Sequence, residues 1–262
     1  MKKFFKILII IILISGAIMF VKFFFLRKKF NQPKSQTQIN ISQPQNEIAA
    51  PETKVESSSD LSPVPAPASD PTPPPAKFLL PIPFYSQAPL SKWDAFHEEM
   101  CEEASVLNAG LYLENKKPTK DQFETDLQGM QKIETSDIGA WKSTTIAETK
   151  KLVDIYFAGK FQSKTIDNPT IIDIETEIAA GHPVVVPLAG REIGNPNFTP
   201  PGPVYHMLVL KGYDSQNFIA NDVGTRRGDS YTYAKEVIMQ NMHDWNAKDI
   251  HLGARRILVF YK

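Results

Sequence analysis

The sequence predicts an α+β fold in which helices from the first part of a globular domain pack on an antiparallel sheet. Two patterns support this prediction. Helical periodicity dominates residues 101–180, and short apolar runs rich in β-branched residues, bounded by Gly and Pro, dominate residues 184–261. Because the helices come first and the strands later, the order differs from the regular strand and helix alternation of parallel α/β folds.

Four segments are expected to be helical. The first begins at Cys101 and extends to Leu111, with acidic residues in its first turn and a buried face of small and apolar residues. The other three are expected at residues 121–130, 144–158 and 171–180, the last of which is ended by Gly181.

The strands are expected to be short and mostly antiparallel. Residues 78–84 contain two prolines between apolar residues, which suits an extended entry segment or an edge strand better than a central strand. Residues 205–210 and 218–222 are expected to form two strands of a hairpin around the turn at residues 212–216. Two further strands are expected at residues 184–188 and 256–261.

Composition divides the chain into three parts. Residues 1–30 are apolar and basic, residues 31–76 are rich in Pro, Ser, Gln and Thr, and residues 77–262 have a globular composition. A domain of roughly 185 residues can bury a sufficient core without metals or disulfides. We therefore expect one folded domain at residues 77–262.

Residues 1–30 are predicted to be an N-terminal membrane anchor. Lysines precede an apolar run at residues 7–21, and a second apolar cluster at residues 23–26 extends it before further basic residues. A cleaved signal peptide is the alternative, because its basic and apolar regions look alike. The lack of an A-x-A-like site after the run favours an uncleaved anchor.

Residues 31–76 are predicted to be a disordered linker. Seven prolines between positions 63 and 75 favour extended polyproline II, and the Gln- and Ser-rich stretches before them contain too little apolar surface for a core. Such a stalk suits a domain held off a bacterial surface. We therefore expect a single-pass membrane protein whose C-terminal domain is extracytoplasmic.

Charge and cysteine content exclude several classes of protein. Lys plus Arg and Asp plus Glu both number 29, and the folded part has no long basic run, so nucleic acid is not an expected partner. Cys101 is the sole cysteine, which excludes an intrachain disulfide and thiolate-rich zinc sites. Neither a metal nor a cofactor is expected.

Three residues have the types and positions of a thiol hydrolase site. Cys101 lies at a predicted helix start, where unpaired N–H groups and the helix dipole lower the pKa of a thiol. His206, at the start of a predicted strand, is the candidate base, and Asp222, at the end of the paired strand, is the candidate that orients the imidazole.

Other residues compete for each role. His182 and His243 are alternative bases, and Asn221 is an alternative orienting group. A lone cysteine is also more often a small buried apolar residue than a nucleophile. The residue types by themselves leave these alternatives open.

Five segments of the chain share a pattern with one known family. They are, in order, Tyr85–Gln87, Trp93–Ser105, Gly181–Val184, His206–Asp214 and Asn221–Gly228. Together they resemble the double-glycine leader peptidase-like family, which is cysteine peptidase family thirty-nine and includes the peptidase domain of bacteriocin-processing transporters. The resemblance spans residues 78–262 and is most specific around His206 and Asp222.

This resemblance implies a papain-like fold and assigns roles. Cys101 would be the nucleophile, His206 the general base and Asp222 the orienting carboxylate. It also implies that Gln87, which residue logic alone does not select, donates its side-chain amide to the oxyanion hole beside the Cys101 N–H.

The chain departs from the family pattern beside the nucleophile. Many members have Cys-Gly-Pro-Ala, whereas Glu102 and Glu103 follow Cys101 here, and Val223 replaces a proline after Asp222. Negative charge near the thiol opposes thiolate formation unless these carboxylates point to solvent.

The sequence therefore predicts a membrane-anchored extracytoplasmic cysteine peptidase that hydrolyses peptide or amide bonds of a peptide or protein substrate. Two alternatives remain. One is an inactive peptidase-like module at the surface that binds peptides, which the acidic pair after Cys101 motivates. The other is an amidase that acts on cell-wall peptides.

Overall fold

The computed structural model describes residues 73–262, which lie within one compact unit. The predicted anchor at residues 1–30 and nearly all of the predicted linker at residues 31–76 lie outside the described residues. Within the described range, no helix combines the length and the apolar character that a membrane crossing requires.

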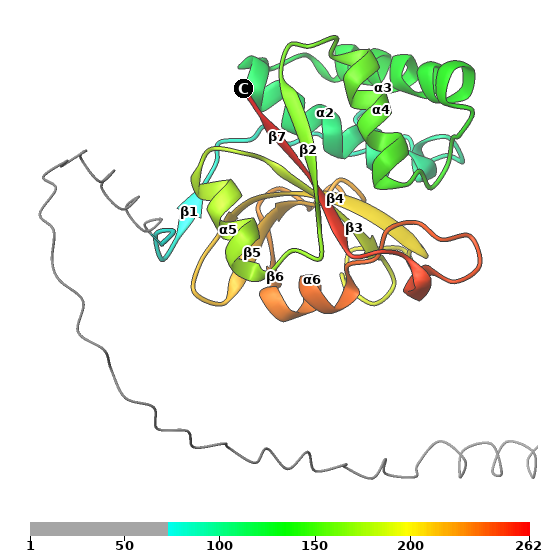
Figure 1. Ribbon diagram of the computed structural model, residues 1–262. Helices are drawn as coiled ribbons and strands as arrows, with labels where there is room; N and C mark the ends of the chain where they lie inside the picture. The colour runs from blue at the N-terminus through cyan, green and yellow to red at the C-terminus, as the bar shows by residue number, and fades with distance from the viewer. Residues whose placement is uncertain (1–72) are drawn as a thin grey trace, which may run out of the picture. The chain divides into compact units, whose positions relative to one another are not determined.

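The described residues form five α-helices and seven strands (Figure 1). The helices are α2 (Cys101–Glu114), α3 (Lys120–Ile133), α4 (Ile146–Tyr156), α5 (Ile171–Ala179) and α6 (Lys235–Asn241). The strands are β1 (Phe78–Leu79), β2 (Gln162–Asp167), β3 (Val184–Ala189), β4 (Tyr205–Tyr213), β5 (Asn217–Asn221), β6 (Tyr231–Ala234) and β7 (Arg256–Tyr261).

All seven strands belong to one antiparallel sheet. Its order is β2-β7-β3-β4-β5-β6, and β1 pairs with the end of β4. In Figure 1, helices α2, α3 and α4 lie on one side of the sheet and α5 and α6 on the other. Strands β3 and β4 are buried along their whole length because both faces are covered. The predicted α+β class is confirmed.

Three of the helices begin with the same local device. A threonine before the helix accepts a hydrogen bond from the third backbone N–H, and the side chain of that third residue bonds back to the threonine. Such a capping box satisfies two N–H groups that the helix itself leaves unpaired. The three boxes join Thr119 with Gln122, Thr145 with Glu148, and Thr170 with Asp173.

Helix α2 is the central helix and carries Cys101 as its first residue. Twelve of its fourteen residues are buried between α3, α4 and the sheet. It packs closely against the end of α4: a Cβ on Gly110 would lie 2.4 Å from Cζ of Phe157. Glycine at this position therefore allows the close approach of the two elements.

Three elements were not predicted from sequence patterns. Strand β2 pairs only with β7 and so lies at the edge of the sheet. It has few apolar residues, so no apolar pattern marks it. Strand β6 and helix α6 are four and seven residues long, which leaves little periodicity to detect.

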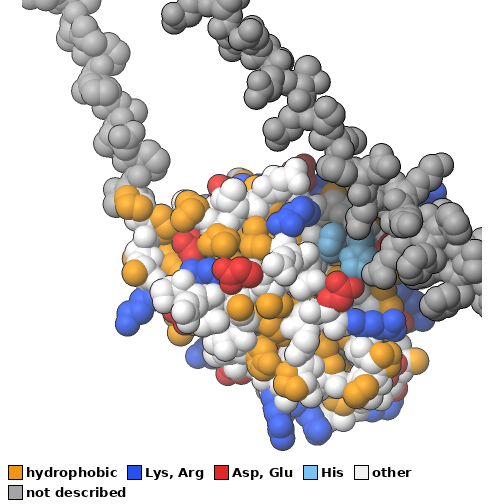
Figure 2. Space-filling model, turned by 90° about the horizontal axis from the view of Figure 1, so that it is seen from below, with side chains coloured by type: hydrophobic (Ala, Val, Ile, Leu, Met, Phe, Trp, Pro, Cys, Tyr) orange, Lys and Arg blue, Asp and Glu red, His pale blue; other side chains and the backbone are white. Residues whose placement is uncertain are grey.

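On the face drawn in Figure 2, charged side chains of both signs are interspersed among apolar and uncharged ones.

Candidate active site

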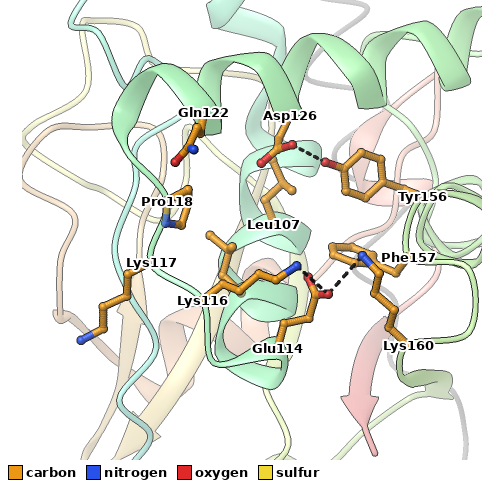
Figure 3. A pocket seen from close by; sticks show the side chains of 11 residues that line it. Leu107, Glu114, Lys116, Lys117, Pro118, Gln122, Asp126, Tyr156, Phe157 and Lys160 are labelled. Atoms are coloured by element: carbon orange, nitrogen blue, oxygen red, sulfur yellow. Dashed lines mark hydrogen bonds and ion pairs between the residues drawn. The ribbon is translucent and has the colours of Figure 1, made fainter.

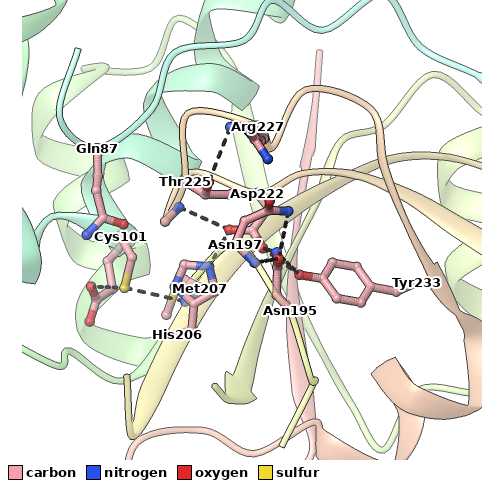
Figure 4. Close-up of polar contacts among 12 residues, drawn as sticks. Gln87, Cys101, Asn195, Asn197, His206, Met207, Asp222, Thr225, Arg227 and Tyr233 are labelled. Atoms are coloured by element: carbon pink, nitrogen blue, oxygen red, sulfur yellow. Dashed lines mark hydrogen bonds and ion pairs between the residues drawn. The ribbon is translucent and has the colours of Figure 1, made fainter. Parts of the chain in front are cut away.

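Cys101 lies at the N-terminus of α2, where this helix packs on β4. Its side chain is only 6% exposed. The sulfur donates a hydrogen bond to Oε2 of Glu102 at 2.9 Å and accepts one from the Met207 N–H at 3.4 Å. Met207 directly follows His206, so the thiol contacts the backbone of the strand that carries the candidate base (Figure 4).

The environment of Cys101 favours the protonated thiol. Burial raises the pKa of Cys101 well above its usual value, and the charge and hydrogen bond of Glu102 raise it further. The Met207 N–H opposes this shift. The expectation that the helix start lowers the pKa of this thiol is therefore wrong for the structure described, because burial and Glu102 outweigh the helix dipole.

Glu102 and Glu103 point inward, not to solvent. Burial, followed by the charge of Glu103, raises the pKa of Glu102 to about 8. Burial, followed by the neighbouring Glu134, raises the pKa of Glu103 well above its usual value, and burial raises that of Glu134 to about 7. Oε1 of Glu102 also accepts the Thr144 N–H at 2.9 Å, which fixes its carboxyl group beside the thiol.

His206 and Asp222 form a buried pair. Nε2 of His206 lies 2.8 Å from Oδ1 of Asp222, and the two side chains are 1% and 0% exposed. Strand register explains the pairing: Val209 of β4 lies opposite Asn221 of β5, so residues 206 and 222 are diagonal neighbours at the same end of the hairpin.

Asp222 is held as a carboxylate by four donors. Burial alone would raise its pKa, but the charge and hydrogen bond of His206 and the hydrogen bonds of two neighbours hold the pKa below its usual value. Those neighbours are the Tyr233 hydroxyl at 2.5 Å and the Asn195 amide at 2.9 Å. The Gly224 N–H also donates to Oδ1 at 3.0 Å.

The geometry leaves one ring nitrogen of His206 for a proton acceptor role. An ionised carboxylate only accepts hydrogen bonds, so Nε2 carries the proton toward Asp222 and Nδ1 is unprotonated in the neutral ring. In Figure 4 the ring lies between Cys101 and Asp222. The hydrogen bonds of the Cys101 thiol go to Glu102 and Met207, and none joins it to the ring among the described residues.

Two glycines allow this ring to sit where it does. A Cβ on Gly224 would lie 2.8 Å from Cε1 of His206, and a Cβ on Gly190 would lie 2.8 Å from Cβ of His206. The ring of Phe198 contacts the imidazole edge to face, with 5.2 Å between centroids. The imidazole is therefore held on several sides by residues that sequence patterns did not select.

Gln87 lies at the cleft but directs its amide elsewhere. Its Nε2 donates to the His97 carbonyl at 2.7 Å and more weakly to the Glu98 carbonyl at 3.3 Å. Its backbone N–H donates to the Val223 carbonyl at 2.9 Å, which ties this segment to the residue after Asp222. Gln87 is thus placed beside Cys101 and His206 in one cleft, with its side chain bonded to backbone.

The cleft containing these side chains has a volume of about 600 Å³. Cys101, His206 and Gln87 line it together, and Asp222 lies behind His206. The structure therefore brings all four predicted residues into one region.

The alternative residues are engaged elsewhere. His182 pairs with Glu177 at 2.8 Å, and Nδ1 of His243 lies 3.4 Å from the Gly253 carbonyl. The Asn221 amide donates to the Pro83 carbonyl at 2.9 Å.

A second hollow of about 560 Å³ lies away from this cleft, beside α2, α3 and the end of α4 (Figure 3). Its charged groups are largely paired with one another. Glu114 binds both Lys116 and Lys160 at 3.1 Å, and the Tyr156 hydroxyl donates to Asp126 at 2.6 Å. It contains no thiol or imidazole.

Sequence reasoning missed the residues that surround the predicted ones. Asn195 and Tyr233 hold Asp222, and Gly224 makes room for His206. Nothing in their local patterns marks them, because Asn195 lies in a loop and Tyr233 in a short strand. For Glu102, the sequence indicated only that a carboxylate near the thiol opposes thiolate formation, and not that the two side chains are hydrogen-bonded.

Comparison with known proteins gives a similar solved structure and a family. A crystal structure of a protein from Bacillus anthracis described as a C39-like peptidase aligns with a TM-score of 0.47 and 16% identity, covering 71% of this chain and 98% of that one. No curated protein matches. The sequence profile of the Peptidase_C39 like family matches residues 79–248, well over half of the chain, which confirms the expected family resemblance. The chain belongs to the Peptidase_C39 like family.

Proposed function

We propose that this protein is a cysteine peptidase in which Cys101 is the nucleophile, His206 the general base and Asp222 the group that orients the imidazole. The observation that carries the proposal is the buried His206–Asp222 pair at 2.8 Å, which lies at the same cleft as the sole thiol of the chain. Membership in a peptidase-like family supports the same chemistry.

The proposed reaction is acyl transfer through the thiol. Nδ1 of His206 takes the proton of Cys101, and the thiolate attacks the carbonyl carbon of a peptide or amide bond. The imidazolium, held by Asp222, then gives its proton to the leaving amine, and water hydrolyses the thioester. Asp222 stays ionised throughout and stabilises the imidazolium.

Two donors are available for the oxyanion. The backbone N–H of Cys101 is among the first N–H groups of α2, which have no partner within the helix. The Gln87 amide lies at the same cleft and donates to the oxyanion after it leaves the His97 carbonyl. The amide then donates to a negatively charged oxygen in place of the neutral His97 carbonyl, which makes a stronger hydrogen bond.

A second candidate function is a peptide-binding module without catalysis. The specific observation in its favour is the hydrogen bond from the Cys101 thiol to Glu102, which opposes ionisation of the sulfur. In such a module the same cleft would bind a peptide that remains intact.

The proposed location is the outer face of a membrane. The basic and apolar composition of residues 1–30 supports an N-terminal anchor, and the Pro-rich residues that follow support a spacer. Membrane fractionation of the full-length protein, with protease added to intact cells, tests both parts of this proposal.

The catalytic proposal is tested with the full-length chain and two readouts. One is hydrolysis of fluorescent casein, and the other is the rate at which iodoacetamide alkylates Cys101, which is the only thiol. Cys101→Ala should abolish hydrolysis, and His206→Ala should abolish hydrolysis and slow alkylation near neutral pH. His182→Ala is the matched control, because this histidine pairs with Glu177 outside the cleft.

The outcomes separate the two candidates. Hydrolysis that depends on both Cys101 and His206 supports the peptidase. A Cys101→Ala variant that hydrolyses casein as fast as the unchanged protein would overturn the nucleophile assignment. Alkylation that is equally fast in the unchanged protein and in His206→Ala, together with no hydrolysis, supports the binding module.

A further inference from the structure

The cleft of Cys101 adjoins another hollow, distinct from the one beside α2, α3 and α4. This adjoining hollow has a volume of about 580 Å³, and Trp93, Thr199 and Gly224 line both it and the cleft. Arg226 and Arg227 line only the adjoining hollow. A peptide bound across Cys101 and His206 can therefore extend from the cleft toward these two arginines.

The loop that carries these arginines is fixed to the candidate catalytic residues. The Asp222 N–H donates to the Gly228 carbonyl at 2.9 Å, and the Arg227 N–H donates to the Thr225 hydroxyl at 3.2 Å (Figure 4). The loop backbone lies directly against Asp222, because a Cβ on Gly228 would lie 1.7 Å from the carbonyl oxygen of Asp222. The backbone of residues 222–228 thus places the arginines in a defined position relative to His206.

Both arginines lack an acidic partner. Within residues 73–262, no carboxylate oxygen lies within 4.0 Å of the Arg226 or Arg227 side-chain nitrogens, whereas Arg256 binds Asp167 at 3.0 Å. Both side chains are exposed. Both line the same hollow, so an anion bound there is attracted by two positive charges.

The charges along the cleft are unevenly distributed. Glu98, Glu99 and Glu102 line the part near Cys101, and the two arginines line the adjoining hollow. A guanidinium group binds a carboxylate through two parallel hydrogen bonds, so this pair selects carboxylates over neutral amides.

We propose, building on the peptidase or peptide-binding function above, that Arg226 and Arg227 form a subsite for a carboxylate of the bound peptide. The carboxylate comes either from an acidic side chain or from the free C-terminus. Both sources present the same group to the arginines, and they differ only in where the peptide chain continues. The subsite therefore selects acidic peptides, or peptides that end near the reactive thiol.

The first experiment uses the single thiol of the full-length protein as a reporter. Cys101 is alkylated with maleimides that carry a carboxylate on alkyl tethers of increasing length, each compared with the matching neutral amide. At low salt, one tether length should react several-fold faster as the acid than as the amide. The ratio should fall toward one in the double variant Arg226→Ala with Arg227→Ala, and also at high salt.

The matched control is Lys117→Ala with Lys120→Ala, which removes the same positive charge outside the cleft. This variant should keep the preference for the acid reagent. An acid-to-amide ratio that survives loss of both arginines, or falls equally in the lysine variant, would overturn the proposal. The readout does not require hydrolysis, so it remains informative even where the peptidase proposal fails.

A second experiment identifies the source of the carboxylate. Fluorescein-labelled peptides are bound to full-length Cys101→Ala, in pairs that differ by Asp or Asn at one position and by a free or an amidated C-terminus. An Arg-dependent gain of several-fold in affinity for the Asp member indicates an acidic side chain, and the same gain for the free terminus indicates a C-terminal carboxylate. Equal binding of every pair contradicts the subsite.

Discussion

At the scale of single residues, two acceptors compete for the proton of Cys101. Oε2 of Glu102 holds it at 2.9 Å in the structure described, and Nδ1 of His206 must take it for catalysis. Burial raises the pKa values of both Cys101 and Glu102, the latter to about 8. Near neutral pH, the carboxyl group beside the thiol is therefore mostly protonated, which reduces its opposition to thiolate formation.

Glu102→Gln should make Cys101 more reactive. Glutamine keeps an oxygen for the Thr144 N–H and removes the negative charge that the sulfur meets once Glu102 ionises above about pH 8, so the pKa of Cys101 should fall. We expect the pH profile of iodoacetamide alkylation to move to lower pH by about one unit, equivalent to ~10-fold faster reaction on the rising limb. Glu98→Gln, an exposed carboxyl group at the same cleft, should leave the profile nearly unchanged. A profile that moves to higher pH in Glu102→Gln would contradict this account.

Gly224→Ala should displace the imidazole without unfolding the protein. The added methyl group would lie 2.8 Å from Cε1 of His206 and 3.0 Å from Cε1 of Phe198, so the ring must move. We expect at least ~10-fold slower hydrolysis of casein, a loss typical of misplaced catalytic groups. Gly129→Ala, whose new methyl meets its nearest neighbour at 3.7 Å, is the control and should retain full activity. Unchanged hydrolysis in Gly224→Ala would show that His206 tolerates displacement.

At the scale of elements, α2 anchors the segment that carries Gln87. The buried Asn108 side chain accepts the Tyr85 N–H at 2.9 Å and donates to the Tyr85 carbonyl at 2.9 Å and to the Ala104 carbonyl at 2.7 Å. One side chain of α2 thus fixes the backbone two residues before Gln87. The start of the helix and the candidate oxyanion donor are positioned by the same element.

Asn108→Ala should weaken this attachment. Alanine favours the helix more than asparagine does, so a loss of stability would come from the unpaired Tyr85 backbone groups and not from helix propensity. We expect the free energy of unfolding to fall by about 1–3 kcal/mol in urea titrations. Asn246→Ala, which removes a hydrogen bond to an exposed loop, should change it by less than about 0.5 kcal/mol. Equal stability of both variants would rule out this role for Asn108.

At the scale of the whole molecule, buried carboxyl groups couple folding to pH. Glu102 and Glu134 have an ordinary pKa of 4.5, and the fold raises these values to about 8 and about 7. At pH values between the ordinary and the raised pKa values, the folded protein holds protons that the unfolded chain has released. The free energy of unfolding therefore falls as pH rises through this range.

Urea titrations of the full-length protein at about pH 5 and about pH 8 measure this effect. The unchanged protein should be less stable at the higher pH, by on the order of a few kcal/mol. Glu134→Gln should reduce the difference, because burial and the charges of Glu102 and Glu148 disfavour the ionised form of Glu134. Stability that rises over this pH range would contradict the placement of these groups.

Local patterns were sufficient for the main elements and for the residue types of the site. The helix at Cys101 and the strands at Val184 and Tyr205 begin where their patterns predicted, because periodicity and turn residues act over a few positions. Local patterns could not locate β2, which is a weakly apolar edge strand. The role of Gln87 came only from family resemblance.

Local sequence patterns were enough to predict that a lone thiol starts a helix and that an imidazole and a carboxylate lie on neighbouring strands. The surroundings of these groups depend on the packed fold, in which Glu102 turns inward to the thiol and Tyr233 and Asn195 converge on Asp222. The physical reason is the range of the forces involved. Helix and strand propensities act between near neighbours, whereas burial, charge pairing and the direction of a side chain depend on packing between segments far apart in the chain.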